Sequence, residues 1–350
     1  MMAGNTFGTC FRITTFGESH GGAVGVVVDG AKAGVPLSEA DVQKHLDRRR
    51  PGQSEVTTQR KETDTVRILS GVFNGVMTGT PIMMMVTNKD ARSQDYNEIK
   101  NLFRPGHADF TYFKKYGLRD YRGSGRASGR ETIGRVAAGA VARKMLAERG
   151  VGVLAYTCYA AGVQCGTFDP DEIENNMVRA CDPEAARKIE QKAREARDAG
   201  NSIGGIVECR ISGLPAGLGE PVFDRLDADL AKAILSIGAT KGIEFGRGFA
   251  AADMTGKEHN DEMSPDGFLT NNAGGMLGGI STGEDVVFRT VFKPTSSISQ
   301  PQQTLDTEGN AVTCRTEGRH DPCIFPRAIP VVEAMAAIVI EDHFQRTANQ

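Results

Sequence analysis

The chain has 350 residues, 39% of them hydrophobic and 24% charged, which is the profile of a soluble globular protein with a buried core in one large domain or two ordinary ones. Its formal net charge of -3 gives no global signal for a nucleic-acid or membrane-surface protein, so any strongly positive field must be local. Seven scattered cysteines without C-x-x-C spacing, and the lack of a signal-peptide-like or bilayer-length apolar stretch, predict a reduced cytosolic protein that is neither exported nor membrane-spanning, without a disulfide framework or structural zinc.

A glycine-flanked polar turn comes first in the chain. Ser19 and His20 lie in GESHG at 17–21, directly before a strand predicted over 23–28. This pattern is typical of polar side chains held out on a tight turn, but an ordinary solvated loop has the same signature. Taken alone, these residues favour the ordinary loop.

A helix is predicted next. It starts at Ser38 as its N-cap, with Asp41 completing a capping box, and it stops before the Pro-Gly pair at 51–52. Cations in a last turn are favoured by the helix dipole, but three consecutive arginines at 48–50 exceed what capping needs. We therefore expect at least one of them to face a ligand.

The segment from Thr57 to Asn88 is predicted to form an antiparallel meander with strands over 66–69, 72–76 and 82–87. Glycine-containing turns separate these strands. The methionines at 83–85 are interpreted as strand core.

Two further polar turns follow the pattern of the first. FRPGHAD at 103–109 has a backbone fixed by proline and glycine, so Arg104 and His107 are expected to project from a rigid support. GRHDPC at 318–323 places Arg319 and Asp321 before the C-terminal helix.

The stretch from Tyr121 to Thr132 holds Arg122, Arg126 and Arg130 among three glycines and two serines, directly before an apolar-periodic run. Glycines let backbone N–H groups approach a ligand, a helix N-terminus adds donors, and guanidinium groups match phosphate and carboxylate oxygens. This composition fits an anion cradle, and by itself it fits a flexible basic loop or an Arg/Gly-rich nucleic-acid-binding module nearly as well. The near-neutral net charge and the absence of tryptophan favour the cradle.

The helix predicted after this stretch, over about 131–148, carries many alanines and glycines outside its apolar stripe. We expect it at the crowded centre of the fold, with the cradle at the bottom of a cleft. The remaining strands are predicted over 151–156, 203–211 and 286–292, and the remaining helices over 182–200, 225–236 and 330–344, the last of them amphipathic and starting at Pro330.

Two segments of the second half suggest ligand contacts. NNAGGMLGGISTG at 271–283 is too glycine-rich for a packed element and too apolar for a solvent loop, which suggests a backbone that closes over a flat ligand. KPTSS at 293–297 offers one cation and three hydroxyls suited to phosphate or ring carbonyl groups.

The stiffened turns carry a common set of polar residues: Ser19, His20, Arg49, Arg104, His107, Ser128, Arg130, Arg319 and Asp321. Several arginines with two histidines and a carboxylate suit a small, multiply anionic substrate that exchanges a proton and loses a leaving group. The sequence has no P-loop, no Rossmann fingerprint and no His/Cys/Asp metal set, so we expect neither nucleotide fold and no metal.

A series of segments in one order, from residue 4 to about 345, resembles the chorismate synthase family. They are GESHG at 17–21, DRRRPG at 47–52, FRPGHAD at 103–109, RDYRGSGRASGRET at 119–132, GLPAGLGEPVFDRLDADLA at 213–231, NNAGGMLGGISTG at 271–283, KPTSS at 293–297 and GRHDPC at 318–323. So many long matches make the resemblance highly specific.

The resemblance implies a single domain over 1–350 with an α/β fold of the α+β type: a β-α-β sandwich in which central helices lie between two antiparallel sheets, assembled as a homotetramer. It also implies a lyase of the shikimate pathway, and so of aromatic amino-acid biosynthesis, that converts 5-enolpyruvylshikimate 3-phosphate to chorismate. The reaction is a 1,4-anti elimination of phosphate and the C6 pro-R hydrogen. The family requires reduced FMN although the reaction has no net redox change.

Residue roles are implied by the same motifs. Substrate contacts are implied for Ser19, Arg49, Arg104, Ser128, Arg130 and Arg319. FMN contacts are implied for Arg49, Arg126, Ala127, Ser128, Gly238, Ala239, Gly278, Lys293, Pro294, Thr295, Ser296, Ser297 and Arg319. His20 is implied to protonate the flavin near N1, His107 to protonate the departing phosphate, and Asp321 to keep flavin N5 competent as a base. We expect both histidines, lying near anions, to have raised proton affinity.

Two positions depart from some relatives. Glu55 stands where they carry a basic residue, and Asn272 stands in NNAGG where they read NHAGG. The first departure removes a candidate anion contact, for which Arg48, Arg49 or Arg60 would have to compensate. No C-terminal flavin-reductase extension is visible, so reduced flavin is expected from an external reductase or reductant, and a role for NADPH on the enzyme itself stays open.

Overall fold

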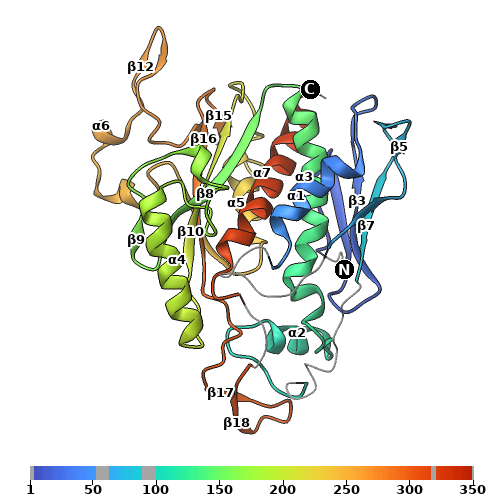
Figure 1. The fold of residues 1–350 in the computed structure, drawn as a ribbon. Helices are drawn as coiled ribbons and strands as arrows, with labels where there is room; N and C mark the ends of the chain where they lie inside the picture. Colours follow the sequence, from blue (N-terminus) through green and yellow to red (C-terminus); the bar gives the residue numbers. More distant parts are fainter. Residues whose placement is uncertain (1–3, 53–62, 89–99, 317–320, 349–350) are drawn as a thin grey trace.

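Two antiparallel sheets form the outer layers of the protein, and helices fill the space between them (Figure 1). The computed structural model describes residues 4–52, 63–88, 100–316 and 321–348. The first sheet has the order β1-β2-β3-β7-β4, from β1 (Thr6–Phe7), β2 (Arg12–Gly17), β3 (Ala23–Asp29), β7 (Ile82–Thr87) and β4 (Val66–Ile68). The second has the order β11-β16-β10-β8-β9, from β11 (Thr240–Phe245), β16 (Val286–Phe292), β10 (Gly205–Ser212), β8 (Gly152–Ala160) and β9 (Val163–Gln164). The expected sandwich of helices between two antiparallel sheets is therefore confirmed.

The layer between the sheets is built from α1 (Glu39–Arg49), α3 (Thr132–Ala147), α5 (Leu226–Leu235) and α7 (Phe325–Ala348). Helix α3 packs on β3 of the first sheet and on α7, while α7 packs on β8 of the second sheet and on α5. The helices outside this layer are α2 (Asp109–Tyr116), α4 (Pro183–Asp198) and α6 (Gly256–His259). Figure 1 shows α4 beside β9, and α2 at the same end of the molecule as the β17–β18 hairpin.

Short hairpins complete the fold. They are β5 (Val72–Phe73) with β6 (Val76–Met77), β12 (Met263–Ser264) with β13 (Gly267–Phe268), β14 (Met276–Leu277) with β15 (Ile280–Ser281), and β17 (Gln302–Leu305) with β18 (Ala311–Cys314). The single strand predicted over 72–76 is wrong, because Asn74 and Gly75 take positive φ and turn the chain into the β5–β6 hairpin. Of the methionines predicted as core in β7, only Met84 is fully buried, since strand side chains alternate between faces.

Local signals set both ends of α1. The Ser38 hydroxyl accepts a hydrogen bond from Asp41 N at 3.3 Å, and Asp41 Oδ2 accepts one from Ser38 N at 2.9 Å, so the predicted capping box is confirmed. The helix ends at Arg49, just before Pro51. Arg49 is only 1% exposed there, so the end of α1 delivers a guanidinium group into the protein.

Helix α7 corrects two expectations. It begins at Phe325, so Pro330 lies inside it rather than at its start, and it is buried on all sides through His343 rather than amphipathic, because helices and sheet surround it. Proline lacks the N–H that would bond the carbonyl four residues earlier. That carbonyl, of Pro326, instead accepts a hydrogen bond from Arg179 Nη1 at 2.6 Å. No helix within the described ranges combines the length and apolarity that crossing a bilayer requires.

The crossing of α3 and α7 depends on a residue without a side chain. A Cβ atom added to Gly139 of α3 would lie 2.3 Å from Ala334 Cβ and 2.5 Å from Ala334 Cα of α7. These distances are far below any van der Waals contact, and Ala334 offers no flexible side chain that moves away. Gly139 therefore fixes the closest approach of the two central helices.

Replacing Gly139 with alanine is expected to lower the free energy of unfolding by about 2 kcal/mol, because overpacking outweighs the better helix propensity of alanine. Urea denaturation measures this change. Gly256→Ala is the matched control, since a Cβ there meets nothing within 4 Å, and its stability should stay within about 0.5 kcal/mol of the parent. Equal stability of both variants would contradict the close approach.

Candidate active site

A large pocket opens at the N-terminal end of α3. Its cavity volume is about 1480 Å³, above the roughly 300–1,000 Å³ of common ligand pockets. The walls come from segments distant in the sequence: β2, 106–109, 123–132, 236–239, 293–297 and the first turns of α7. A cavity of this size has room for two small molecules at once. Of the cradle stretch at 121–132, residues 123–132 line it, whereas Tyr121 and Arg122 do not.

The cradle stretch is an ordered pair of 3₁₀ turns, Gly125–Ala127 and Gly129–Glu131, that leads into α3. The Ser128 hydroxyl accepts a hydrogen bond from Arg130 N at 3.3 Å, which closes the second turn. Arg126 and Arg130 turn into the protein, whereas Arg122 is exposed and pairs with Asp120. Two of the three arginines of this stretch therefore do not lie on an exposed basic loop.

Arg49 and Arg130 share one buried carboxylate. Asp64 Oδ2 lies 2.5 Å from Arg49 Nη2, and Asp64 Oδ1 lies 3.1 Å from Arg130 Nη1. Burial lowers the pKa of the Arg49 guanidinium, while Asp64 opposes that change. Within the described part of the chain, the buried Nε of Arg49 has no hydrogen-bond partner. A buried donor of this kind is suited to an anionic ligand in the pocket.

Asp109 is the centre of a second charged cluster. It accepts hydrogen bonds from Arg104 Nε at 2.8 Å and Arg104 Nη2 at 2.9 Å, and Arg119 Nη1 lies 2.9 Å from its Oδ1. His107 Nδ1 lies 3.1 Å from the same Oδ1, and His107 Nε2 lies 3.2 Å from the Ser124 hydroxyl. Burial opposes ionisation of Asp109, but the bonds from Arg104 and His107 outweigh it and hold the pKa of Asp109 far below its ordinary value.

The protonation of His107 differs from the sequence expectation. Burial lowers the pKa of His107 below its ordinary value, and the nearby Arg104 adds to this effect although Asp109 opposes it. The expectation of raised proton affinity at His107 is thus wrong for the protein alone, because the arginines expected to hold substrate also surround the imidazole. An anion placed beside His107 would act in the opposite direction.

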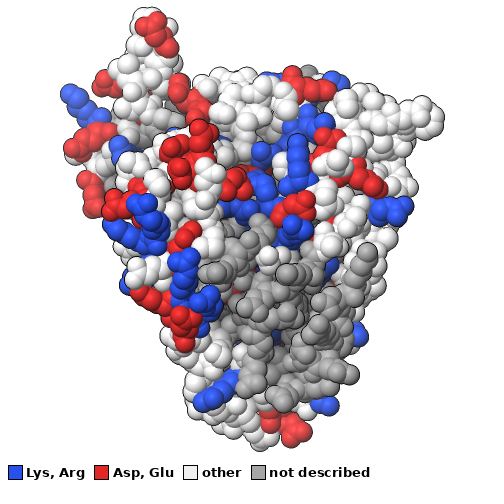
Figure 2. All heavy atoms as spheres, viewed as in Figure 1, with Lys and Arg blue, Asp and Glu red and all other residues white. Residues whose placement is uncertain are grey.

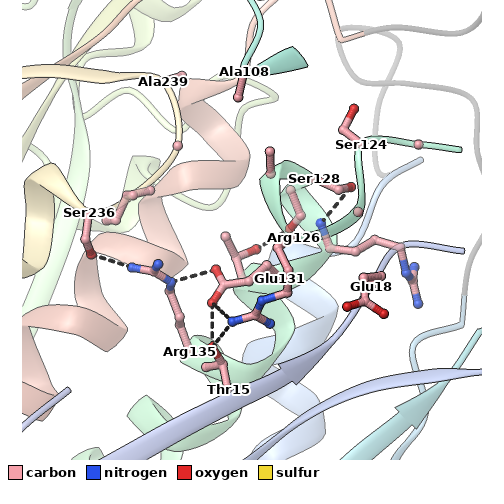
Figure 3. Close-up of a pocket in the computed structure, with 18 of the residues that line it drawn as sticks. Thr15, Glu18, Ala108, Ser124, Arg126, Ser128, Glu131, Arg135, Ser236 and Ala239 are labelled. Carbon is pink, nitrogen blue, oxygen red and sulfur yellow. Dashed lines mark hydrogen bonds and ion pairs between the residues drawn. The ribbon is translucent and has the colours of Figure 1, made fainter. Parts of the chain in front are cut away.

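A chain of polar contacts crosses the pocket from the first sheet to α5 (Figure 3). Arg126 Nη2 donates to the Thr15 hydroxyl at 2.7 Å, and the Thr15 hydroxyl donates to Glu131 Oε1 at 2.8 Å. Glu131 Oε2 accepts from Arg135 Nε at 2.8 Å, and Arg135 Nη1 donates to the Ser236 hydroxyl at 2.6 Å. Five side chains from β2, the cradle, α3 and the end of α5 are thus fixed together.

Another wall of the pocket is formed by residues from two short segments, 238–239 and 293–297. Gly238, Ala239, Lys293, Thr295, Ser296 and Ser297 line the pocket, whereas Pro294 does not. Ala239 takes the left-handed φ of +72°, a conformation that glycine adopts far more readily than alanine. Strain of this kind persists mainly at functional sites. Within the described residues the buried Thr295 hydroxyl has no hydrogen-bond partner, so this wall also offers an unmatched polar atom.

Asp321, just before α7, and Arg327, in its first turn, form an ion pair at the pocket. Arg327 Nη1 lies 2.5 Å from Asp321 Oδ2, and Arg327 Nε donates to the carbonyl of Arg49 at 3.2 Å. Both residues line the pocket. Arg319 and Glu55 lie outside the described residues.

Other predicted site residues lie away from the pocket surface. Ser19 and His20 sit behind Gly123, where an added Cβ would be 2.7 Å from Ser19 Oγ and 2.6 Å from His20 Nε2. Arg104 also stands behind the lining, bound to Asp109. Gly278 lies in the turn between β14 and β15, outside the lining of this chain's pocket.

Some glycines at 271–283 have a packing cause. A Cβ on Gly275 would lie 2.4 Å from the carbonyl oxygen of Asp285, and one on Gly279 would lie 2.4 Å from Arg225 Cγ. Asn272 is structural too: its Oδ1 accepts a hydrogen bond from Arg247 Nε at 2.9 Å. Gly275 and Gly279 therefore pack against their own chain, a Cβ on Gly278 would meet nothing within 4 Å, and no residue of 271–283 lines this pocket. The predicted contact with a flat ligand stays a prediction.

The acids that hold the arginines were missed by sequence reasoning. These acids are Asp64, Asp109 and Glu131. Sequence reasoning also missed two arginines that line the pocket, Arg135 and Arg327. Asp109 and Glu131 stand inside recognised motifs, so the rule that a buried arginine needs a carboxylate would have pointed to them. Asp64 had no such signal, because the chain brings it to Arg49 only by folding. No metal-binding cluster of His, Cys, Asp and Glu occurs among the described residues.

Comparison with known proteins identifies the family whose members the chain resembles. A model of the chorismate synthase family matches residues 11–345. A chorismate synthase from Syntrophobacter fumaroxidans is 57% identical over 341 residues, covering 97% of each chain. One from Methanosarcina mazei is 58% identical over 356 residues, covering 99% of this chain and 97% of the other. A solved structure described as the crystal structure of chorismate synthase is 30% identical, with a TM-score of 0.77, and covers 97% of this chain and 93% of that chain.

Replacing Asp64 with asparagine tests the shared carboxylate. Asparagine keeps the shape and tolerates the positive φ of 42° at this position, so the change removes mainly the charge. Breaking a buried ion pair should cost about 3–5 kcal/mol in the free energy of unfolding. Asp29→Asn, at the exposed pair with Arg12, should cost under about 1 kcal/mol in the same urea titration. Similar losses in the two variants would refute the role of Asp64.

Proposed function

The chain belongs to the chorismate synthase family and is an enzyme of the shikimate pathway that produces chorismate; from this premise we propose the chemistry of its site. The enzyme converts 5-enolpyruvylshikimate 3-phosphate to chorismate by 1,4-anti elimination of phosphate and the C6 pro-R hydrogen. It uses reduced FMN without net redox change. The observation that carries the proposal is the convergence of Arg49, Arg130 and His107 from three distant segments on one cavity of about 1480 Å³.

The residues of the pocket fit a flavin. Ala127, Gly238 and Ala239 offer backbone groups to a flat ring system, and Lys293, Thr295, Ser296 and Ser297 offer a cation and hydroxyls to polar ring atoms or a phosphate. We assign FMN contacts to these residues together with Arg49, Arg126, Ser128, Gly278, Pro294 and Arg319. When bound, reduced FMN supplies an electron-rich face that offsets positive charge at the breaking allylic C–O bond and an N5 atom that takes the C6 proton.

The substrate carries two carboxylates and a phosphate, and the proposal assigns them to guanidinium groups. Arg49, Arg104, Arg130 and Arg319 bind these anions, with Ser19 and Ser128 as hydroxyl donors. The unmatched Nε of Arg49 supports this assignment. Asp64 holds the forks of Arg49 and Arg130 in place before the substrate arrives, so binding does not have to order two long side chains.

Proton transfers are assigned to His107, His20 and Asp321. His107 gives its Nε2 proton to the departing phosphate. Asp109 accepts a hydrogen bond from His107 Nδ1 and so fixes the ring orientation, with Nε2 on the side of the Ser124 hydroxyl. In the same proposal His20 protonates the flavin near N1, and Asp321 keeps N5 competent as a base. Arg327 Nη1, 2.5 Å from Asp321 Oδ2, holds this carboxylate in place at the pocket.

The proposal extends to assembly and supply. Residues 1–350 act as one domain, which is supported by a hydrophobic core that includes both sheets and the central helices. The chain forms a homotetramer, which is supported by apolar side chains that stand exposed on its surface: Val222, Phe223, Phe249, Met263 and Leu269. The enzyme works in the cytoplasm with seven free thiols, and an external flavin reductase or reductant supplies reduced FMN.

An anaerobic assay tests the proposed reaction. Phosphate release from 5-enolpyruvylshikimate 3-phosphate should occur with FMN and a chemical reductant, and should be absent with oxidised FMN or without flavin. The reason is that only the reduced ring carries the electron density the elimination needs. Release at the same rate without flavin would overturn the proposal.

Asp109→Asn tests the proton donor. Removing the carboxylate that raises the pKa of His107 should lower this pKa further, so the alkaline limb of the kcat/KM profile should shift to lower pH. Turnover should fall about 10–100-fold, while affinity for oxidised FMN should change little.

His107→Ala should also lower turnover far more than FMN affinity, but without a shifted limb, because the titrating group is gone. His259→Ala, on the remote α6, is the matched control and should behave like the parent. An unmoved pH profile in Asp109→Asn would remove Asp109 from the mechanism, and unchanged turnover in His107→Ala would remove His107.

A further inference from the structure

Three thiols gather at the outer edge of β8, away from the pocket. Cys158 lies on β8 itself, and Cys165 N donates to the carbonyl of Cys158 at 2.9 Å. Residue Ala180 forms a parallel bridge with Thr157, so the segment that carries Cys181 joins the same edge. Cys158 and Cys181 are buried in one small apolar cluster, and Cys165 packs against it.

Cys165 and Cys181 face each other across this edge. The carboxylate of Asp182 accepts hydrogen bonds from Gly166 N at 2.9 Å and Thr167 N at 3.0 Å, which ties the residues after each cysteine together. The Cys165 thiol donates to the carbonyl of Thr157 at 3.4 Å, and the Cys181 thiol donates to the carbonyl of Thr167 at 3.4 Å, so the Cys181 thiol is directed at the segment that carries Cys165. Cys165 is partly exposed, whereas Cys181 is 3% exposed.

The two thiols differ in chemistry. The interaction with Cys181 lowers the pKa of Cys165, while the interaction with Cys165 and then burial raise the pKa of Cys181. Burial raises the pKa of Cys158 to about 12 and that of Cys209 well above its ordinary value. The N-terminus of α4 begins beside Cys181, with Asp182 as its N-cap, and a helix N-terminus favours a nearby thiolate.

We propose that Cys165 and Cys181 form a reversible disulfide, so that this edge of the second sheet is a peroxide-sensitive modification site. Neither residue lines the pocket, and the proposal does not depend on the assigned reaction. An exposed nucleophilic thiol next to a buried resolving thiol is the arrangement that such chemistry requires.

The chemistry needs hydrogen peroxide as the oxidant. The Cys165 thiolate attacks one peroxide oxygen, the O–O bond breaks, and the leaving hydroxide takes a proton to become water, which leaves a sulfenic acid on Cys165. The Cys181 sulfur then attacks the sulfenic sulfur, the S–O bond breaks, and the released hydroxide takes the Cys181 proton to form a second water. Two thiols and one peroxide thus give one disulfide and two waters, and a dithiol reductant reverses the change.

The disulfide would close a segment that supports the pocket from behind. Residues between the two cysteines, including Glu174, Asn176 and Arg179, line a second cavity of about 600 Å³ that shares Arg327 with the pocket. Arg179 donates to the carbonyls of Arg48 at 2.9 Å and Pro326 at 2.6 Å. Oxidation therefore restrains the segment that holds the end of α1 and the first turn of α7 in place.

Peptide mapping of the full-length protein tests the proposal. Treatment with low hydrogen peroxide should give one peptide pair cross-linked through Cys165 and Cys181, lighter by the mass of two hydrogen atoms, and dithiothreitol should restore both thiols to alkylation. Cys181→Ser should leave a sulfenic acid on Cys165 that dimedone traps, while Cys165→Ser should abolish both products. Cys209→Ser is the matched control and should behave like the parent.

Three results would overturn the proposal. One is full alkylation of Cys165 and Cys181 after peroxide treatment of a protein whose thermal melt is intact. Another is a disulfide that maps to Cys158 and Cys165. The last is dimedone labelling of the buried Cys209 at the same rate as Cys165, because that would mean that oxidation follows unfolding rather than the arrangement at this edge.

Discussion

A guanidinium group in a protein interior needs a carboxylate, and this requirement organises the whole pocket. Asp64 holds Arg49 and Arg130, Asp109 holds Arg104 and Arg119, Glu131 holds Arg126 and Arg135, and Asp321 holds Arg327. Where one acid serves two arginines, the cluster keeps a net positive charge and its donors are already oriented. The guanidinium groups that bind an anionic ligand are thus already held in place in the folded protein. The conformational entropy of these long side chains is lost during folding rather than during binding.

The fold brings these clusters together because the central helices α3 and α7 both have their N-terminal ends at the cavity. Helix α3 begins at the cradle and α7 begins beside Asp321, and both deliver their first turns to the same cavity. Gly139 lets them cross closely, which sets the distance between those first turns. On the face seen in Figure 2, acidic and basic side chains are interspersed along α4 and above it.

Arg179 shows how a remote residue supports this geometry. Its guanidinium satisfies the carbonyl of Pro326 that Pro330 cannot bond, and it also binds the carbonyl of Arg48 beside the pocket residue Arg49. The same side chain lies in the segment enclosed by Cys165 and Cys181. Pocket, helix start and thiol pair are therefore connected through one buried cation, although they are far apart in the sequence.

Short-range signals such as caps, alternation and motifs were enough to predict the strands β3, β4, β7, β8, β10 and β16, the ends of α1, the position of the cradle before α3 and the family to which the chain belongs. The same signals did not predict the strands β1, β2, β9 and β11. Tertiary structure decided the rest. Only folding brings Asp64 to Arg49, puts His20 behind Gly123 and removes Gly278 from this chain's pocket. It also lowered the pKa of His107, which its motif alone suggested would rise. Burial and the approach of charges from distant segments are properties of the packed molecule, and no local pattern records them.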